Sequence, residues 1–190
     1  MSDACAHAQQ VLADSDCLHD EAAVQAAYDR LAQEIHADYA DTNPLILCVM
    51  IGGLVPTAEL IRRFDFPFEL DYLHATRYRG ETTGGGLVWK VSPSSMLGGR
   101  HVLVIDDILD EGHTLKAILS ALQEQQPAAL RTAVLCHKRH DRRVEGVHAE
   151  YIGLDVEDRY VFGCGMDYRN YHRQLGSIRA VAEPMAGAAS

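Results

Sequence analysis

Continuous apolar runs alternate along the chain with segments of helical periodicity. The run 45–51 is apolar throughout and stops at Gly52 and Gly53, which is typical of a strand buried on both faces of a sheet. Before it, Asp20 can cap a helix whose apolar positions recur at three- and four-residue steps. That helix should end before Pro44, because proline disfavours helical geometry in the preceding residue.

The same alternation continues through the rest of the chain. Further strands are expected over 69–78, 87–91, 102–105, 132–136 and 150–154, and helices over 57–63 and 115–122. This order predicts an α/β fold with a mostly parallel sheet flanked by helices on both faces. Because ligands bind beyond the carboxyl ends of such strands, the loops after the runs that end at Ile51, Ile105, Cys136 and Leu154 are the candidate site.

Length and composition indicate one domain over 1–190. The 190 residues are 47% hydrophobic and 23% charged, enough for an ordinary core. Residues 1–19 lack clear periodicity and 183–190 are small, so both ends are expected to be flexible. The glycine-rich stretch 79–86 is expected to form a mobile loop.

Charge and cysteine content narrow the classes of function. A net charge of −10 disfavours binding to the phosphates of nucleic acid. No apolar stretch has the roughly 20 residues of a membrane-spanning helix, and the start of the chain does not resemble a signal peptide, so a cytoplasmic protein is expected. The five scattered cysteines favour neither disulfides nor a zinc site. His137 and His140 lack supporting ligands and are expected to face solvent or the rim of the site.

The segment 101–119, HVLVIDDILDEGHTLKAIL, carries the clearest chemistry. A buried strand leads to Asp106 and Asp107, then to Asp110, then to a glycine turn that begins a helix. The N–H groups of 112–114 and the helix N-terminus can hold a phosphate. Carboxylates beside a phosphate site predict a ligand that carries both hydroxyls and phosphates, with magnesium as a possible bridge. An isolated acidic turn of this kind can also be purely structural.

This segment resembles the phosphoribosyl-diphosphate signature of type I phosphoribosyltransferases. The signature has four apolar residues, two acids, two apolar residues, an acid, a small residue, Gly, any residue and Thr. The chain departs from it at Glu111, where Ser or Thr is usual. Between about Leu18 and Val181 the order of motifs is similar to that of the hypoxanthine-guanine branch. The further matches are Leu70-Asp71-Tyr72, Lys138, Tyr160-Val161-Phe162-Gly163, Asp167-Tyr168 and Arg173.

The resemblance implies a fold, a reaction and an assembly. The expected fold is the type I phosphoribosyltransferase fold with a small hood and a mobile loop. The implied reaction moves the phosphoribosyl group of 5-phosphoribosyl 1-diphosphate to hypoxanthine or guanine, with Mg²⁺ as cofactor, in purine salvage. The implied assembly is a homodimer or homotetramer.

The resemblance also implies roles for the acids and for the base pocket. Asp106 and Asp107 would contact the ribose hydroxyls and organise magnesium. Asp110 would be the catalytic acid or base for the proton at N7 of the purine, because the base loses a proton as its nitrogen attacks the anomeric carbon. Lys138 would donate to the 6-oxo group, and this favours hypoxanthine and guanine over adenine. Tyr160 would stack on the base.

The remaining matched residues are implied in binding the base edge, the phosphate and the diphosphate. Val161 would offer its backbone to the base edge. Asp167 would be linked to a second magnesium, and Arg173 would lie near the diphosphate. The phosphate loop would comprise Glu111, Gly112, His113 and Thr114, with Glu111 lacking the usual hydroxyl contact.

Two departures concern the diphosphate side of the site. The family usually has Lys or Arg at the position of Ile51, and the peptide bond after that position can be cis. The diphosphate would then be held by the N–H groups of Gly52 and Gly53 and by magnesium, and its binding should be weaker. In the mobile loop, which closes over the reacting centre, the family commonly has a Ser-Tyr pair, whereas this chain has Arg77 and Tyr78. Tyr78 is retained, and Arg77 can bring a cation near the diphosphate on closure, in place of the one missing at Ile51.

Other classes of function stay open. A xanthine-preferring or orotate-type transferase is a near alternative. A regulator that uses the phosphoribosyl site as a sensor would draw on Lys138, Arg139, Arg142 and Arg143 to bind nucleic acid, against the net negative charge. A Rossmann dehydrogenase and a Walker-type nucleotidase are disfavoured because their glycine motifs do not occur in the sequence.

Overall fold

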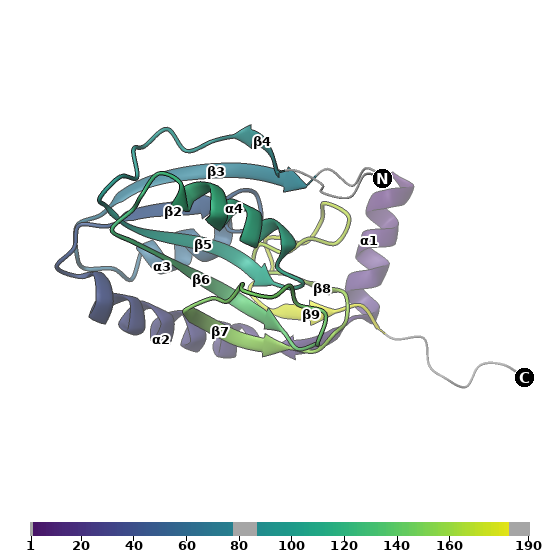
Figure 1. The fold of residues 1–190 in the computed structure, drawn as a ribbon. Coiled ribbons are helices and arrows are strands. Elements are labelled where there is room, and N and C mark those ends of the chain that lie inside the picture. Colours follow the sequence, from purple (N-terminus) through teal and green to yellow (C-terminus); the bar gives the residue numbers. More distant parts are fainter. Residues whose placement is uncertain (1, 78–86, 183–190) are drawn as a thin grey trace, which may run out of the picture.

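The computed structural model describes residues 2–77 and 87–182 and is centred on a six-stranded sheet of order β4-β3-β2-β5-β6-β7 (Figure 1). The strands are β2 (Leu45–Val49), β3 (Glu69–Arg77), β4 (Leu87–Val91), β5 (His101–Leu109), β6 (Ala129–Lys138) and β7 (Tyr151–Val156). Neighbouring strands are parallel except for the antiparallel pair β3 and β4. The predicted mostly parallel sheet is confirmed.

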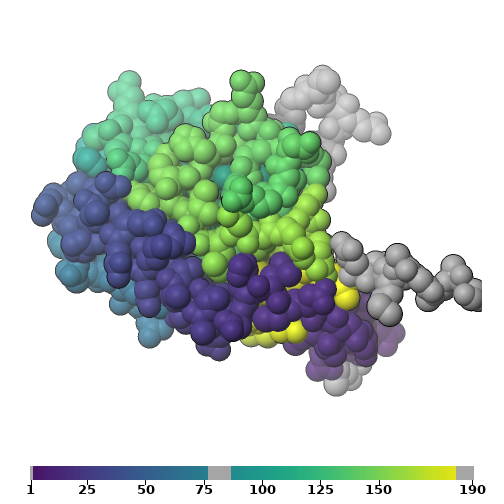
Figure 2. Space-filling model, turned by 90° about the horizontal axis from the view of Figure 1, so that it is seen from below, coloured from purple at the N-terminus to yellow at the C-terminus, as the bar shows by residue number. Residues whose placement is uncertain are grey.

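Helices cover both faces of this sheet. The helices α2 (Glu21–Tyr39) and α3 (Leu54–Ile61) pack on one face, in a cluster that contains Leu31, Leu60 and Ile105. The helix α4 (His113–Gln123) packs on the other face with Val104 and Ile118. In the view from below, α2 runs along one edge of the molecule beside the green segment that contains β7 (Figure 2).

Several element ends differ from the prediction, including those of β2, α3 and β5 near the crevice. β2 ends at Val49, so Ile51 lies in the turn that follows. α3 begins at Leu54 rather than at residue 57, since Pro56 is tolerated in a first helical turn. β5 continues to Leu109, which pairs with His137 of β6. The acid pair therefore lies within a strand, and pairing with β6 fixes its backbone.

A small three-stranded sheet forms the hood and includes the N-terminal segment. Its antiparallel strands are β1 (Asp16–His19), β9 (Ile178–Ala180) and β8 (Val161–Phe162). The helix α1 (Asp3–Asp14) lies against the hood, where Ala8 is buried and its carbonyl accepts a 2.7 Å hydrogen bond from His172 Nε2. The expectation that residues 1–19 are flexible is therefore wrong for 3–19, because distant hood residues supply the packing that the segment's own periodicity does not reveal.

The strand order places a topological switch point between β2 and β5. The chain passes from β2 outward to β3 and β4, and from β5 in the opposite direction to β6 and β7. The loops that leave the carboxyl ends of β2 and β5 therefore diverge, and a crevice opens between them. Both loops carry predicted site residues.

Several predictions fall on residues outside the described ranges. They are the mobile loop at 79–86, the contribution of Tyr78, the side-chain role of Arg77 and the flexible tail at 183–190. Within 2–77 and 87–182, none of the helices combines the length and the apolar content needed to cross a lipid bilayer.

Candidate active site

A cavity of about 270 Å³ lies where the carboxyl ends of β5 and β6 meet the hood. Its lining is Asp107, Ile108, Asp110, Lys138, Tyr160, Val161, Met166 and Asp167. Residues that are far apart in the sequence and were predicted for the base, the ribose and the metal thus face one space. Ile108 and Met166 were not predicted, because apolar wall residues carry no chemical signature in a sequence.

Asp110 is held by two donors. Lys138 Nζ lies 2.6 Å from Oδ2, and His140 Nε2 lies 2.7 Å from Oδ1. Burial would raise the pKa of Asp110, but the hydrogen bonds from Lys138 and His140 outweigh it and lower the pKa below its ordinary value. The carboxylate is therefore ionised and can accept a proton once a donor moves away.

His140 is a site residue that the sequence interpretation misplaced. It was expected to face solvent or the rim of the site. Its side chain is only 3% exposed, so it does not face solvent, and its contact with Asp110 places it beside the cavity. It stands two residues after Lys138, a spacing that puts both side chains on one side of an extended chain. That spacing was the available signal. His137 points elsewhere, and its Nδ1 lies 2.8 Å from Oδ1 of Asp155.

Asp106 and Asp107 form a pair of half-buried carboxylates on β5. Asp107 N–H donates to Oδ1 of Asp106 at 2.9 Å. Burial and the adjacent Asp107 carboxylate raise the pKa of Asp106 well above its ordinary value, and burial also raises the pKa of Asp107. The pair is short of positive charge, and this is the electrostatic situation that a divalent cation relieves.

The donor set fits magnesium better than a cation held by protein ligands alone. Residues 2–77 and 87–182 contain no group of three or more His, Cys, Asp or Glu side chains arranged around one metal position. Magnesium commonly takes only one or two carboxylates and completes its shell with water and substrate phosphates. Asp106 and Asp107 match that requirement.

The loop before α4 is shaped for close approach of an anion. Gly112 has φ of 81° and a Cβ there would lie 2.6 Å from Val147 Cγ1, so only glycine fits. Within the described residues, no acceptor is found for the N–H groups of Gly112, His113 and Thr114. The carboxylate oxygens of Glu111 lie 3.7 Å from His113 Nε2 and 3.8 Å from Arg142 Nε.

The turn after β2 differs from the prediction in two respects. The cis peptide bond joins Met50 to Ile51, whereas the peptide after Ile51 was expected to be cis. The N–H of Gly53 donates to Val49 O at 2.8 Å, so the turn itself uses this donor where α3 begins, and the N–H is not left open for diphosphate here. Gly52 faces the acid pair, and a Cβ there would lie 1.9 Å from Asp107 Oδ2.

Arg173 and Asp167 meet beside the acid pair. Arg173 Nη2 lies 2.5 Å from Asp167 Oδ1, and Nη1 donates to Gly165 O at 2.7 Å. The charge of Arg173 also acts to lower the pKa of Asp107, against the larger effect of burial. The guanidinium is thus near Asp107 and Asp167, two carboxylates for which the resemblance implied a metal-binding role.

Tyr160 and Val161 form the hood side of the cavity. Tyr160 is 52% exposed, and its ring packs edge-to-face with the Tyr168 ring at a centroid distance of 5.4 Å. Val161 is buried in β8 and pairs with Ala180 of β9. Half of Tyr160 is therefore open to a ligand, while the strand fixes the backbone of Val161 beside it.

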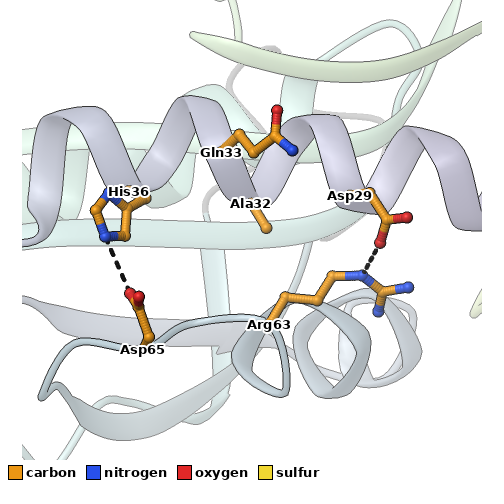
Figure 3. Close-up of a pocket in the computed structure, with 6 residues that line it drawn as sticks. All are labelled: Asp29, Ala32, Gln33, His36, Arg63 and Asp65. Carbon is orange, nitrogen blue, oxygen red and sulfur yellow. Dashed lines mark hydrogen bonds and ion pairs between the residues drawn. The ribbon is translucent and has the colours of Figure 1, made fainter.

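A larger cavity of about 540 Å³ lies between α2 and the end of α3 (Figure 3). Its charged side chains already pair with one another: Arg63 Nε lies 2.6 Å from Asp29 Oδ1, and His36 Nε2 lies 3.0 Å from Asp65 Oδ1. The chemistry predicted from the sequence is concentrated in the smaller cavity.

Comparison with known proteins points to one family. The family profile described as phosphoribosyl transferase domain matches residues 14–169. The hypoxanthine-guanine-xanthine phosphoribosyltransferase of Tritrichomonas foetus is 34% identical over 87% of this chain and 91% of its own length. The hypoxanthine-guanine phosphoribosyltransferase of Streptococcus pneumoniae is 32% identical over the same shares. The structure of a hypoxanthine phosphoribosyltransferase from Staphylococcus aureus superimposes with a TM-score of 0.84 at 29% identity, covering 89% of this chain and 92% of that one.

Proposed function

The chain belongs to the phosphoribosyltransferase family, and from this premise we propose that it transfers the phosphoribosyl group of 5-phosphoribosyl 1-diphosphate to hypoxanthine or guanine. The products are IMP or GMP and pyrophosphate, and the reaction belongs to purine salvage, in the cytoplasm. The observation that carries the proposal is the cavity in which Asp110, Lys138 and Tyr160 face one another beside the acid pair.

The base pocket is proposed to work by exchange of one hydrogen bond. Lys138 Nζ now binds Asp110, and its side chain is 12% exposed, so the ammonium is largely withdrawn from water. A 6-oxo group that enters the cavity gives this ammonium a second acceptor. Oδ2 of Asp110 is then free to accept the proton at N7. Tyr160 stacks on the base, and the backbone at Val161 meets the base edge.

Asp106 and Asp107 are proposed to bind the ribose hydroxyls and to take part in holding magnesium. As the glycosidic bond to diphosphate breaks, positive charge develops on the ribose, and nearby carboxylates stabilise it. Magnesium, when bound, would neutralise charge on the departing diphosphate. The close approach of Gly52 leaves Asp107 Oδ2 room that any larger residue would fill.

The phosphate loop is proposed to bind the 5-phosphate through the N–H groups of Gly112, His113 and Thr114 and the Thr114 hydroxyl. Glu111 carries a negative charge in this loop, but His113 and Arg142 flank it. We infer that the Arg142 guanidinium reduces the repulsion between Glu111 and the phosphate. On the diphosphate side, the proposed donors are the N–H of Gly52 and the guanidinium of Arg173, with Asp167 linked to a second magnesium.

A homo-oligomer, either dimer or tetramer, is the proposed assembly. Leu70 and Tyr72 of β3 are half exposed, as are Ile51 in the turn after β2 and Leu54, the first residue of α3. The parallel register pairs Leu70 with Ile46, which packs in one cluster with Leu60 of α3, so Leu70 lies on the face of the sheet that α3 covers. Sedimentation of the wild type and of Leu70→Asp tests the assembly: a wild-type monomer would contradict it.

The central experiment mixes purified protein, magnesium and 5-phosphoribosyl 1-diphosphate with hypoxanthine, guanine, xanthine or adenine, and follows nucleotide formation. Hypoxanthine or guanine should react, and adenine should be disfavoured about 10- to 100-fold, since an unmatched buried donor costs of order 1–3 kcal/mol. Preference for xanthine would favour the xanthine-type alternative. Absence of turnover with every 6-oxopurine would refute the proposal, and salt-dependent RNA binding in that case would favour a regulator.

A further inference from the structure

The imidazole of His140 is fixed in one protonation pattern by its two neighbours. The backbone N–H of Arg142 donates to Nδ1 at 3.1 Å. Nδ1 is therefore an acceptor, and Nε2 carries the ring proton. The contact of 2.7 Å between Nε2 and Asp110 Oδ1 is thus a hydrogen bond donated by a neutral histidine. A proton on Nδ1 would point at the N–H of Arg142, and the two donors would repel each other.

The segment that carries His140 is anchored to both sides of the site. Arg139 N–H donates to Val156 O at 2.8 Å, and Val144 N–H donates to Glu111 O at 2.9 Å. The Arg143 guanidinium donates to Lys138 O at 2.8 Å and to Asp110 O at 3.4 Å. The His140 ring is nearly fully buried within this braced segment. It cannot follow a ligand into the cavity without breaking these contacts.

Lys138 and His140 hold Asp110 in unequal ways. The ammonium of Lys138 is at the end of a flexible four-carbon side chain and can turn to another acceptor, whereas His140 has a rigid ring on an anchored segment. A ligand that presents a carbonyl oxygen therefore removes the lysine from Oδ2 but leaves the histidine on Oδ1. The carboxylate keeps its orientation while one of its oxygens is released.

We propose that His140 is a positioning residue of the transfer reaction: it holds Oδ1 of Asp110 so that Oδ2 faces N7 of the purine after Lys138 has moved to the 6-oxo group. This inference rests on the proposed function and deepens it. N9 forms the bond to the anomeric carbon, the bond from that carbon to diphosphate breaks, and its electron pair leaves with diphosphate. The proton at N7 passes to Oδ2 of Asp110. His140 stays neutral and transfers no proton.

The test compares two substitutions of His140 with a matched control. His140→Phe keeps the ring but removes the donor, and kcat with hypoxanthine and guanine should fall about 10- to 100-fold, since misplacement of a catalytic group by about 1 Å can cost 10²-fold. KM for 5-phosphoribosyl 1-diphosphate should stay within about twofold of the wild type, because no diphosphate or phosphate contact is touched. His140→Gln retains an amide N–H at a similar distance and should recover most of kcat.

His137→Phe is the control, since it places the same substitution three residues away on a histidine that binds Asp155 rather than Asp110. It should leave kcat and both KM values unchanged. The inference is overturned if His140→Phe keeps wild-type kcat. It is also overturned if folded His140→Gln is as slow as folded His140→Phe, because rescue by the donor is then absent.

Thermal unfolding separates loss of positioning from loss of fold. If His140→Phe unfolds, His140→Asn replaces it in the comparison: asparagine is polar but too short to reach Asp110, so it should be slower than His140→Gln, and equal rates would overturn the inference. A wild type that turns over no 6-oxopurine refutes the proposed function itself. A wild type that is active and insensitive to His140 refutes only the positioning role.

Discussion

The loops after β5 and β2 meet at the same crevice but contribute to the site by different means. The β5 side presents charged side chains, and Asp110 is held between Lys138 and His140 at 2.6 and 2.7 Å. The β2 side presents Ile51 and two glycines. Its contribution is that the backbone of Gly52 lies so close to Asp107 that a hydrogen atom fits between them but a methyl group does not.

This difference determines how each loop responds to substitution. On the β5 side, function depends on groups that donate, accept or carry charge, so removal of a group should lower the rate without unfolding the protein. On the β2 side, function depends on the absence of side-chain atoms, so the addition of atoms should disturb both packing and catalysis. Substitutions that distinguish these two expectations test the comparison.

The largest effect is expected on the β5 side. Asp110→Asn keeps the shape of the side chain but removes the proton acceptor, and kcat with hypoxanthine should fall about 10²- to 10⁴-fold. KM for 5-phosphoribosyl 1-diphosphate should change little. Steady-state kinetics with both substrates measure the two quantities separately.

The chain offers a matched control for this substitution. Asp155 also pairs with a histidine and a cation, His137 at 2.8 Å and Arg139 at 2.6 Å, but it lies outside the cavity. Asp155→Asn should therefore leave kcat unchanged. Wild-type turnover by Asp110→Asn would remove Asp110 from the proposed proton transfer.

The β2 side should be broken by a single methyl group. In Gly52→Ala the new Cβ would lie 1.9 Å from Oδ2 of Asp107, so the turn or the acid pair must shift. The free energy of unfolding should decrease by about 1–3 kcal/mol. The value of kcat/KM should fall at least about 10-fold, because the acids move away from the reacting ribose.

Gly98→Ala is the control for that substitution, since the nearest atom to its Cβ is Gln125 O at 3.4 Å. It should change neither the melting temperature nor kcat/KM appreciably. If Gly52→Ala has the stability and activity of Gly98→Ala, close approach is not the basis of the β2 contribution.

Asp107 connects the two sides, and its substitution should separate stability from activity. Asp107→Asn removes one charge of a repelling, half-buried pair, so the free energy of unfolding at neutral pH should increase by about 0.5–2 kcal/mol while activity is lost. Folding raises the pKa of this pair, so the pair destabilises the protein only when ionised. The gain should therefore be full above the raised pKa values and should disappear as the pH falls toward the ordinary range of aspartate.

Asp71→Asn serves as the control, because it should change the free energy of unfolding in the opposite direction. Burial acts to raise its pKa, but hydrogen bonds from the backbone of Ser95 and Tyr72 and from the hydroxyls of Ser95 and Ser94 lower it. Asp71→Asn should therefore lower the free energy of unfolding at neutral pH. Denaturant titrations at several pH values measure the free energy of unfolding of both variants. A lower value for Asp107→Asn than for the wild type would contradict the repulsion between Asp106 and Asp107.

The sequence predicted the features that are local in the chain. Strong apolar runs predicted the central sheet, and the signature around Asp106 predicted which strand end carries the chemistry. The segment 3–19 was missed because its packing comes from the hood, as the hydrogen bond between His172 and Ala8 illustrates. His140 was missed for a related reason, since its partner Asp110 is 30 positions away. The hydrogen bond from the Gly53 N–H to Val49 O could not be predicted, because only the folded turn shows which donors it uses.

The smallest effect is expected where the sequence departs most visibly from the family. Ile51 is 47% exposed, so the ammonium in Ile51→Lys can reach solvent near the diphosphate side without being buried. An exposed charge pair contributes about 0.2–1 kcal/mol, so KM for 5-phosphoribosyl 1-diphosphate should fall up to about fivefold, with kcat nearly constant. Met96→Lys adds the same charge at a residue that is 85% exposed and does not line the cavity, and it should not change this KM. If Ile51→Lys matches Met96→Lys, the β2 loop does not require a cation, and backbone and guanidinium donors suffice for diphosphate binding.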